Sequence, residues 1–263
     1  MNRIDKKFKE LKIIGRKAFI AYITAGDPDL VATKKIVLAL EQSGVDIVEL
    51  GIPFSDPLAD GPTIQAASTR ALRSGASLKK IFKMAGSLRA KTGIPIVFMT
   101  YFNPILRYGI EKFFKSCRAS GVDGVIVPDL PAEESGELMV LGRASGVDTI
   151  FLIAPTSTAE RVKKIAKNSR GFIYYVSLTG VTGARSRLPS EVLSKVRYIK
   201  SITSKPVAVG FGVSNSSQAR EIAKSADGVI VGSAIVKIIG EKKNMIPRVS
   251  KFSKILAEAI HGA

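Results

Sequence analysis

The most regular feature of the chain is a short apolar run that follows a small residue and an Asp and ends in a turn rich in Gly, Pro or Ser. Such continuous apolar runs are typical of strands buried on both faces of a parallel sheet. The pattern predicts about eight strands. They lie at 44–56, 121–131, 146–157 and 226–235, and in the simpler runs 19–24, 94–100, 171–177 and 205–210.

Segments with the 3.6-residue periodicity of helices separate these runs. Asp27-Pro28, Thr158 and Ser214 resemble helix starts, and glycines follow several of the predicted helices. The predicted helices are 30–42, 63–73, 78–91, 110–120, 133–144, 159–168, 189–202 and 218–224, with additional helices at 6–14 and 246–260.

The alternation of strand and helix runs through 263 residues without a linker or a low-complexity segment. It predicts an α/β fold, a (β/α)8 barrel. An open doubly wound sheet is the alternative, but the period is regular and no GxGxxG follows the first strand. We expect one domain over 1–263, with an extra N-terminal helix within 1–16 and a C-terminal helix within 241–263.

Composition limits the chemistry. The single Cys and the single His, His261 near the C-terminus, exclude a disulfide framework, a Cys-based zinc site and a Ser-His-Asp triad. The net charge of +18 would suit a nucleic-acid binder, but the cations are scattered among apolar positions with few aromatic residues. A solvated basic surface is the favoured interpretation. With neither a targeting signal nor a membrane-spanning run, we expect a cytoplasmic protein.

Two turns of Gly and Ser follow the seventh and eighth predicted strands, at 210–214 and 232–234. Barrel enzymes commonly bind phosphate with backbone amides at these two strand ends. The alternative is that the glycines only permit tight turns. A third Gly-rich segment, 178–187, carries two arginines and predicts a lid, with an ordinary solvent loop as its alternative.

Glu49 is the candidate acid. In a strand it shares a face with Val45 and Ile47 and points into the mouth of the barrel, where low dielectric raises its pKa. A buried ion pair is the alternative. Asp60 and Asp56 compete for the role of a second carboxylate in the loop that follows, and position alone does not choose between them. A Schiff-base aldolase is disfavoured, because the predicted strands carry only Lys205, at the wrong end.

Several longer motifs carry a family resemblance. They are YITAGDPD at 22–29, VELGIPFSDPLADGPTIQ at 48–65, YFNP at 101–104, VPDLP at 127–131, YVSLTGVTGARSRLP at 175–189, VGFGVSN at 209–215 and DGVIVGSAIVK at 227–237. Together they resemble the tryptophan synthase alpha chain family over residues 4–260. The segment 48–65 is the most specific of them.

The resemblance implies a lyase of tryptophan biosynthesis that cleaves indole-3-glycerol phosphate to indole and glyceraldehyde 3-phosphate. Glu49 and Asp60 would be its catalytic carboxylates: Glu49 would move the protons, and Asp60 would accept a hydrogen bond from the indole N–H. Further implied substrate contacts are Gly183, Gly212, Gly232 and Ser233 at the phosphate, Tyr174 at the glycerol hydroxyls, Tyr22, Thr100, Leu130, Ile153 and Ile230 around the indole, and Thr182 on the lid near Asp60.

The resemblance also implies a partner. An alpha2-beta2 complex would hold pyridoxal phosphate in the beta chain and no cofactor or metal in this chain. Asp56 would contact the beta chain, within a surface formed by 53–60, 101–107 and 129–132. A basic nucleic-acid-binding barrel and a phosphosugar isomerase barrel are the competing hypotheses. The pair of Glu49 and Asp60 at this spacing speaks against both.

Overall fold

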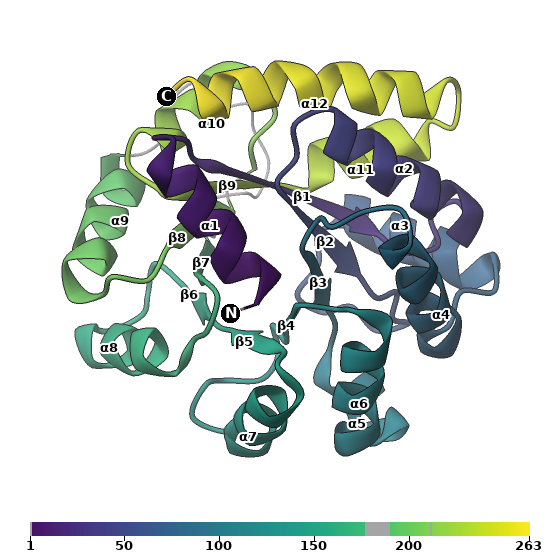
Figure 1. The fold of residues 1–263 in the computed structure, drawn as a ribbon, viewed down its shortest axis with the longest axis horizontal. Helices are drawn as coiled ribbons and strands as arrows, with labels where there is room; N and C mark the ends of the chain where they lie inside the picture. Colours follow the sequence, from purple (N-terminus) through teal and green to yellow (C-terminus); the bar gives the residue numbers. More distant parts are fainter. Residues whose placement is uncertain (1, 177–189, 211) are drawn as a thin grey trace.

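The computed structural model describes residues 2–176, 190–210 and 212–263. In this part of the chain a parallel sheet is surrounded by helices (Figure 1). Its strands, in the order β5-β4-β3-β2-β1-β9-β8-β7-β6, are β1 Ala18–Thr24, β2 Ile47–Gly51, β3 Ile96–Met99, β4 Gly124–Ile126, β5 Asp148–Ile150, β6 Leu152–Ile153, β7 Ile173–Val176, β8 Val207–Gly210 and β9 Gly228–Val231.

The two ends of this order close the sheet into a barrel. β5 and β6 are successive parts of one predicted strand, separated only by Phe151. β5 pairs with β4 and β6 pairs with β7, both in parallel. The (β/α)8 barrel is therefore confirmed, and the open doubly wound sheet is excluded because its two edges would not meet in one strand.

The helices alternate with the strands, with additions that the periodicity did not predict. α5 and α11 are new: each follows a strand directly, so its apolar residues merge with the strand's run. The helices are α1 Arg3–Ile13, α2 Leu30–Gln42, α3 Pro62–Arg73, α4 Leu78–Arg89, α5 Phe102–Tyr108, α6 Ile110–Ser120, α7 Gly136–Ser145, α8 Ala159–Asn168, α9 Ser190–Ile202, α10 Ser216–Ala223, α11 Ser233–Gly240 and α12 Met245–His261.

Of the predicted helix starts, Thr158 is confirmed, because its side chain accepts the Arg161 N–H. The other two were wrong by one or two residues. The caps of α2 and α10 are Asp29 and Asn215, whose side chains accept N–H groups of the first turn. Asp27 instead receives two hydrogen bonds from Arg70, at 2.7 and 2.8 Å.

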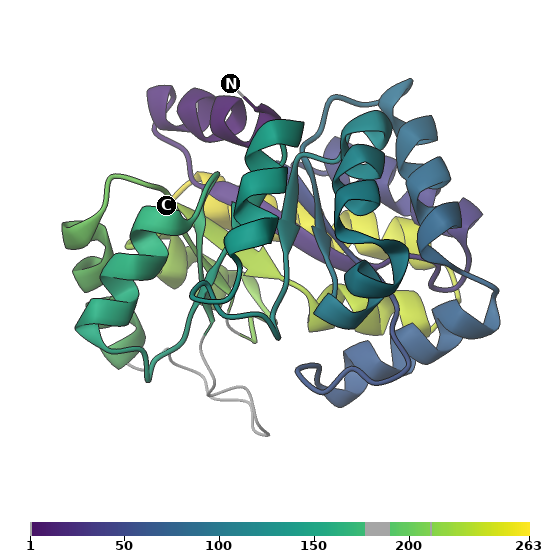
Figure 2. The same cartoon turned by 90° about the horizontal axis from the view of Figure 1, so that it is seen from below.

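The core has two layers. Between the sheet and the outer helices lies a large apolar cluster that contains Ile36, Phe98 and Val209. Inside the barrel lies a second cluster, in which Ile20, Ile47 and other inward-facing residues meet α1. Figure 2 shows α1 across one end of the barrel. Because α1 covers the amino ends of the strands, only their carboxyl ends are open to a substrate. No helix within the described residues is long and apolar enough to cross a membrane.

Candidate active site

Glu49 lies in the middle of the open end of the barrel. On β2 it pairs in register with Tyr22 of β1 and Val97 of β3. Its side chain is fully buried, and neither carboxylate oxygen has a hydrogen-bond partner among residues 2–176, 190–210 and 212–263. The ion pair that was the alternative interpretation is thus not found there. Burial, and next the nearby charge of Asp60, raise the pKa of Glu49 to about 8.

The strand that carries Glu49 begins later than the sequence suggested. Ile47 faces the interior as expected, but Val45 precedes the strand and packs in the outer cluster. The predicted face was therefore right for Ile47 and wrong for Val45.

Asp60 is the second carboxylate of this mouth. It is half-buried at the end of the loop after β2, where the Tyr101 hydroxyl accepts the N–H of Ala59 at 2.9 Å. Desolvation raises the pKa of Asp60, and the Tyr101 hydroxyl partly opposes the rise. Asp56, in the same loop, is exposed. Of the two aspartates, Asp60 is the one whose charge acts on Glu49.

Two tyrosines flank Glu49, and each occupies space left by a glycine. A Cβ atom on Gly51 would overlap the Tyr22 hydroxyl, and one on Gly210 would lie 2.6 Å from the Tyr174 ring. Burial raises the pKa of both phenols, and the charges of Glu49 and Asp60 raise them further. Both tyrosines therefore stay neutral and remain hydrogen-bond donors near neutral pH.

The candidate phosphate residues follow two adjacent strands, since β8 pairs with β9. Gly232 precedes α11 without a side-chain cap, and Ser233 is the exposed first residue of that helix. Gly212 is exposed, with open space where a side chain would be. Uncapped N–H groups at a helix start, together with the helix dipole, attract an anion.

The residues expected to line the indole pocket do not all lie on the interior face of the sheet. Ile230 belongs to the interior cluster, as expected. Ile153 packs in the outer cluster, so it does not line the interior; Leu130 lies in the turn after β4 and packs against the same cluster. Alternation along β3 puts Met99 on the inner face and Thr100 on the other. Sequence reasoning missed Met99 and Leu152, which face the interior and which alternation from Glu49 and Tyr174 would have identified.

Thr182, Gly183 and the candidate lid 178–187 lie outside the described residues. Tyr101 was expected only within the partner surface 101–107, although its hydroxyl accepts the Ala59 N–H and so holds the loop that carries Asp60. The same loop exposes Leu58, whose side chain is 85% accessible, and Leu106 of α5 is 56% accessible. Both lie within the segments 53–60 and 101–107 that the resemblance assigned to a partner surface.

The barrel and its mouth define an enzyme of acid–base chemistry, with one carboxyl group protonated near neutral pH beside a second carboxylate. The family model "Tryptophan synthase alpha chain" matches residues 8–261. This chain belongs to the tryptophan synthase alpha chain family, lyases that cleave indole-3-glycerol phosphate to indole and glyceraldehyde 3-phosphate for tryptophan biosynthesis.

Relatives and solved structures agree with this assignment. A tryptophan synthase alpha chain of Geobacter sulfurreducens is 51% identical over 262 residues, which covers 99% of both chains. One of Caldanaerobacter subterraneus is 49% identical over 263 residues, which covers 99% of this chain and all of the relative. The crystal structure of tryptophan synthase subunit alpha from Legionella pneumophila has a TM-score of 0.92 at 37% identity, covering 99% of this chain and 98% of that one.

Proposed function

We propose that Glu49 and Asp60 carry out the family's cleavage reaction in this chain. The observation that supports this most directly is Glu49: a fully buried carboxyl group without a hydrogen-bond partner among the described residues, whose pKa is raised to about 8. An unpaired buried acid costs stability, so its retention is better explained by chemistry than by packing.

The reaction needs an acid first. Indole C3 is a poor carbanion, so it must be protonated before its bond to the glycerol chain breaks. Glu49, protonated near neutral pH, delivers that proton, and its carboxylate then takes the proton of the adjacent hydroxyl. The carbon–carbon bond breaks as the carbonyl of glyceraldehyde 3-phosphate forms, and the bonding electron pair returns to the ring as indole. One proton is given and one is taken, so Glu49 ends as it began.

Asp60 stabilises the positive charge that protonation creates. Its carboxylate accepts the hydrogen bond of the indole N–H, which becomes more acidic when C3 is protonated. An interaction that strengthens in the transition state accelerates the chemical step. Glu49 and Asp60 have different roles for a physical reason: Glu49 is fully buried and protonated, and Asp60 is half-buried near the Tyr101 hydroxyl, which lowers its pKa.

The remaining residues bind the substrate. The N–H groups at Gly212, Gly232 and Ser233 hold the phosphate, and Tyr174 contacts the glycerol hydroxyls. Tyr22 and Ile230 are walls of the indole pocket. The phosphate assignment is supported by the adjacent positions of β8 and β9 and by the uncapped start of α11.

We further propose that this chain docks onto a pyridoxal-phosphate-dependent beta chain in an alpha2-beta2 complex, which condenses the released indole with serine. The loop 53–60, with exposed Asp56 and Leu58, and α5, with exposed Leu106, would form the contact. Free indole is small and neutral and would escape into solvent, so release toward a partner conserves it.

The test of the proposed residue roles is an assay of indole release from indole-3-glycerol phosphate by the purified chain, alone and with a beta chain. We expect release by the parent chain, stimulation by the beta chain, and loss of both in Glu49→Gln. A folded Glu49→Gln variant with parental turnover would overturn the assignment.

A further inference from the structure

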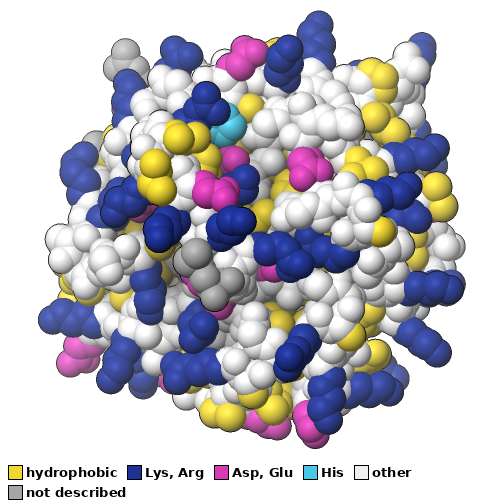
Figure 3. All heavy atoms as spheres, in the orientation of Figure 1, with side chains coloured by type: hydrophobic (Ala, Val, Ile, Leu, Met, Phe, Trp, Pro, Cys, Tyr) yellow, Lys and Arg dark blue, Asp and Glu magenta, His cyan; other side chains and the backbone are white. Residues whose placement is uncertain are grey.

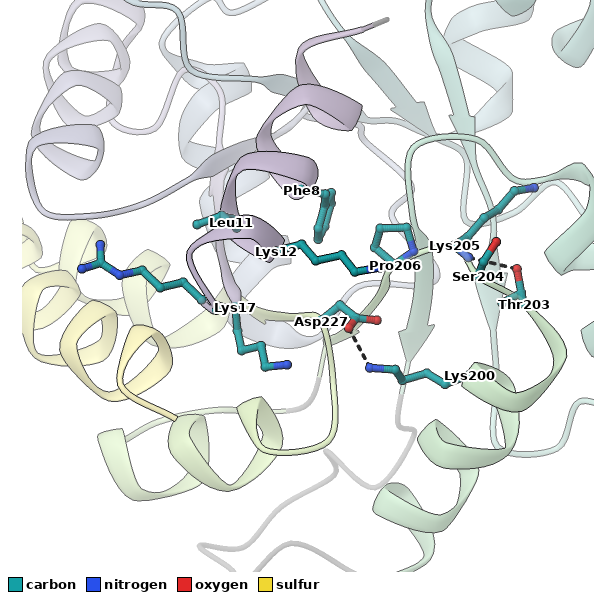
Figure 4. A pocket seen from close by; sticks show the side chains of 12 residues that line it. Phe8, Leu11, Lys12, Lys17, Lys200, Thr203, Ser204, Lys205, Pro206 and Asp227 are labelled. Atoms are coloured by element: carbon teal, nitrogen blue, oxygen red, sulfur yellow. Dashed lines mark hydrogen bonds and ion pairs between the residues drawn. The ribbon is translucent and has the colours of Figure 1, made fainter.

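A cavity of about 410 Å³ lies at the closed end of the barrel, opposite Glu49 (Figure 4). The end of α1, the segment before β8 and the residue before β9 line it. Because these segments precede their strands, the cavity lies at the amino ends of the strands and takes no part in the proposed reaction. None of the catalytic or substrate-binding roles proposed above uses a residue of this cavity.

Cations dominate its walls. The lining holds one acidic side chain, Asp227, and five basic ones: Lys12, Arg16, Lys17, Lys200 and Lys205. Figure 3, in the orientation of Figure 1, shows Lys and Arg side chains spread over this whole face of the molecule, with Asp and Glu side chains among them.

Two of the five cations are already used. Lys200 forms an ion pair with Asp227 at 2.6 Å, and Asp227 also accepts the Val207 N–H at 3.0 Å. The Lys205 Nζ donates to the carbonyl oxygens of Ala166, Lys167 and Ser169, which end α8. These interactions fix one side of the cavity and pair Asp227, the acidic side chain of its lining, with Lys200.

Lys12, Arg16 and Lys17 have neither an ion pair nor a side-chain hydrogen bond within the parts of the chain that the structure describes. Lys12 and Arg16 are exposed, and Lys17 is half-buried. Figure 4 shows Lys12 and Lys17 on the same side of the cavity, facing Asp227 and Lys200. Three like charges along one short segment repel one another, and an anion between them would remove that repulsion.

The floor of the cavity is apolar. Phe8 and Leu11, 7% and 6% exposed, belong to the interior cluster, and Pro206 lies beside them. Phe8 packs on Phe172 with ring centroids 5.7 Å apart, so this floor is held rigidly. An apolar floor under a cationic rim fits a ligand that has an apolar part as well as a charged group.

We propose that this cavity binds a small phosphorylated metabolite, with its phosphate at Lys12, Arg16 and Lys17 and its apolar part on Phe8 and Leu11. Phosphate is favoured over a carboxylate because three cations line this part of the cavity and a phosphate presents three oxygens to them. The site is separate from the phosphate residues at the mouth, which lie at the other end of the strands.

The experiment uses the full chain carrying Ser233→Glu, which puts negative charge at the mouth and so disfavours anions there. Phenyl phosphate and methyl phosphate are titrated while amide NMR signals are followed. We expect shifts of Gly15 and Ser204 on the cavity rim, with tighter binding of phenyl phosphate because of the apolar floor. Shifts of Gly212 and Gly232 would report on the mouth alone.

Two matched double variants complete the test. Lys12→Gln with Lys17→Gln should weaken phenyl phosphate binding about tenfold or more, because both cations lie at the ligand. Lys79→Gln with Lys83→Gln removes the same charge from exposed positions of α4 and should change it less than about twofold, because distant exposed charges are screened. Unshifted Gly15 and Ser204 signals, or equal weakening by both variants, would overturn the proposal.

Discussion

Tyr101 opposes the rise that desolvation causes in the pKa of Asp60, although 41 positions separate the two residues in the sequence. The Tyr101 hydroxyl also accepts the N–H of Ala59 at 2.9 Å, and its ring packs on Phe54 with centroids 5.4 Å apart. Tyr101 thus touches the loop after β2 near its start and at its end. A residue at the carboxyl end of β3 thereby fixes a carboxylate that follows β2.

We expect Tyr101→Phe to lower kcat up to roughly tenfold, because its hydroxyl holds the Ala59 N–H beside Asp60 and a neutral hydrogen bond contributes about 0.5–1.5 kcal/mol. KM should change less, since the phenol holds Asp60 and not the phosphate. Tyr108→Phe is the control: it removes a hydroxyl at the end of α5, the helix that Tyr101 precedes, where it meets the Ser116 hydroxyl at 3.1 Å. Steady-state kinetics of both variants measure this effect. If Tyr101→Phe kept the kcat of the parent, Tyr101 would not position Asp60.

Glu49→Gln keeps the shape of the side chain but removes its proton. Turnover should fall by roughly 10²–10⁴-fold, the usual contribution of general acid–base catalysis. Single-turnover measurement of indole release checks this. The carboxyl band in infrared difference spectra of parent against Glu49→Gln should titrate near pH 8, the value to which burial raises this pKa. Titration near the ordinary value of 4.5 would contradict the structure.

The same substitution should change stability in a pH-dependent way. The folded state holds the Glu49 proton more tightly than the unfolded state, so the free energy of unfolding falls as pH rises from about 4.5 to about 8. Across that window the parent should lose on the order of a few kcal/mol relative to Glu49→Gln. Chemical denaturation at pH 5 and pH 9 measures this, with exposed Glu258→Gln as the control that shows no such difference.

Ser233→Glu places negative charge at the first position of α11, where the substrate phosphate is expected. KM should rise about tenfold or more, while the melting temperature stays close to that of the parent, because the residue is exposed. Ala159→Glu adds the same charge at the exposed first position of α8 and should leave KM nearly unchanged. If the two variants had the same KM, the phosphate assignment would be wrong.

Asp56→Lys should reduce the stimulation of indole release by a beta chain and leave the chain folded, since Asp56 is exposed. Docking that orders the loop 53–60 would also position Asp60, so the partner should raise kcat and not only tighten substrate binding. Light scattering and indole assays during titration with the beta chain measure both effects. Glu258→Lys, on α12, makes the same charge change and should behave as the parent does; equal stimulation of Asp56→Lys would contradict the contact.

The sequence by itself determined the barrel, because buried parallel strands must be apolar runs of β-branched residues and the helices between them must be amphipathic. It also determined the inward position of Glu49, since a side chain two residues from Ile47 on a strand shares its face. The Gly turns after β8 and β9 were visible for a similar local reason: a backbone that binds an anion needs residues without bulk.

Only the tertiary structure decided which neighbours each of these residues has. Side chains alternate between the two faces of a strand, so an error of one residue reverses the predicted face. Ile153 and Thr100 were therefore expected at the indole, whereas their neighbours Leu152 and Met99 face the interior. The contact of the Tyr101 hydroxyl with the Ala59 N–H, next to Asp60, joins loops after different strands. Barrel closure brings these loops together. A local sequence pattern does not predict such contacts, because they join segments that are far apart in the chain.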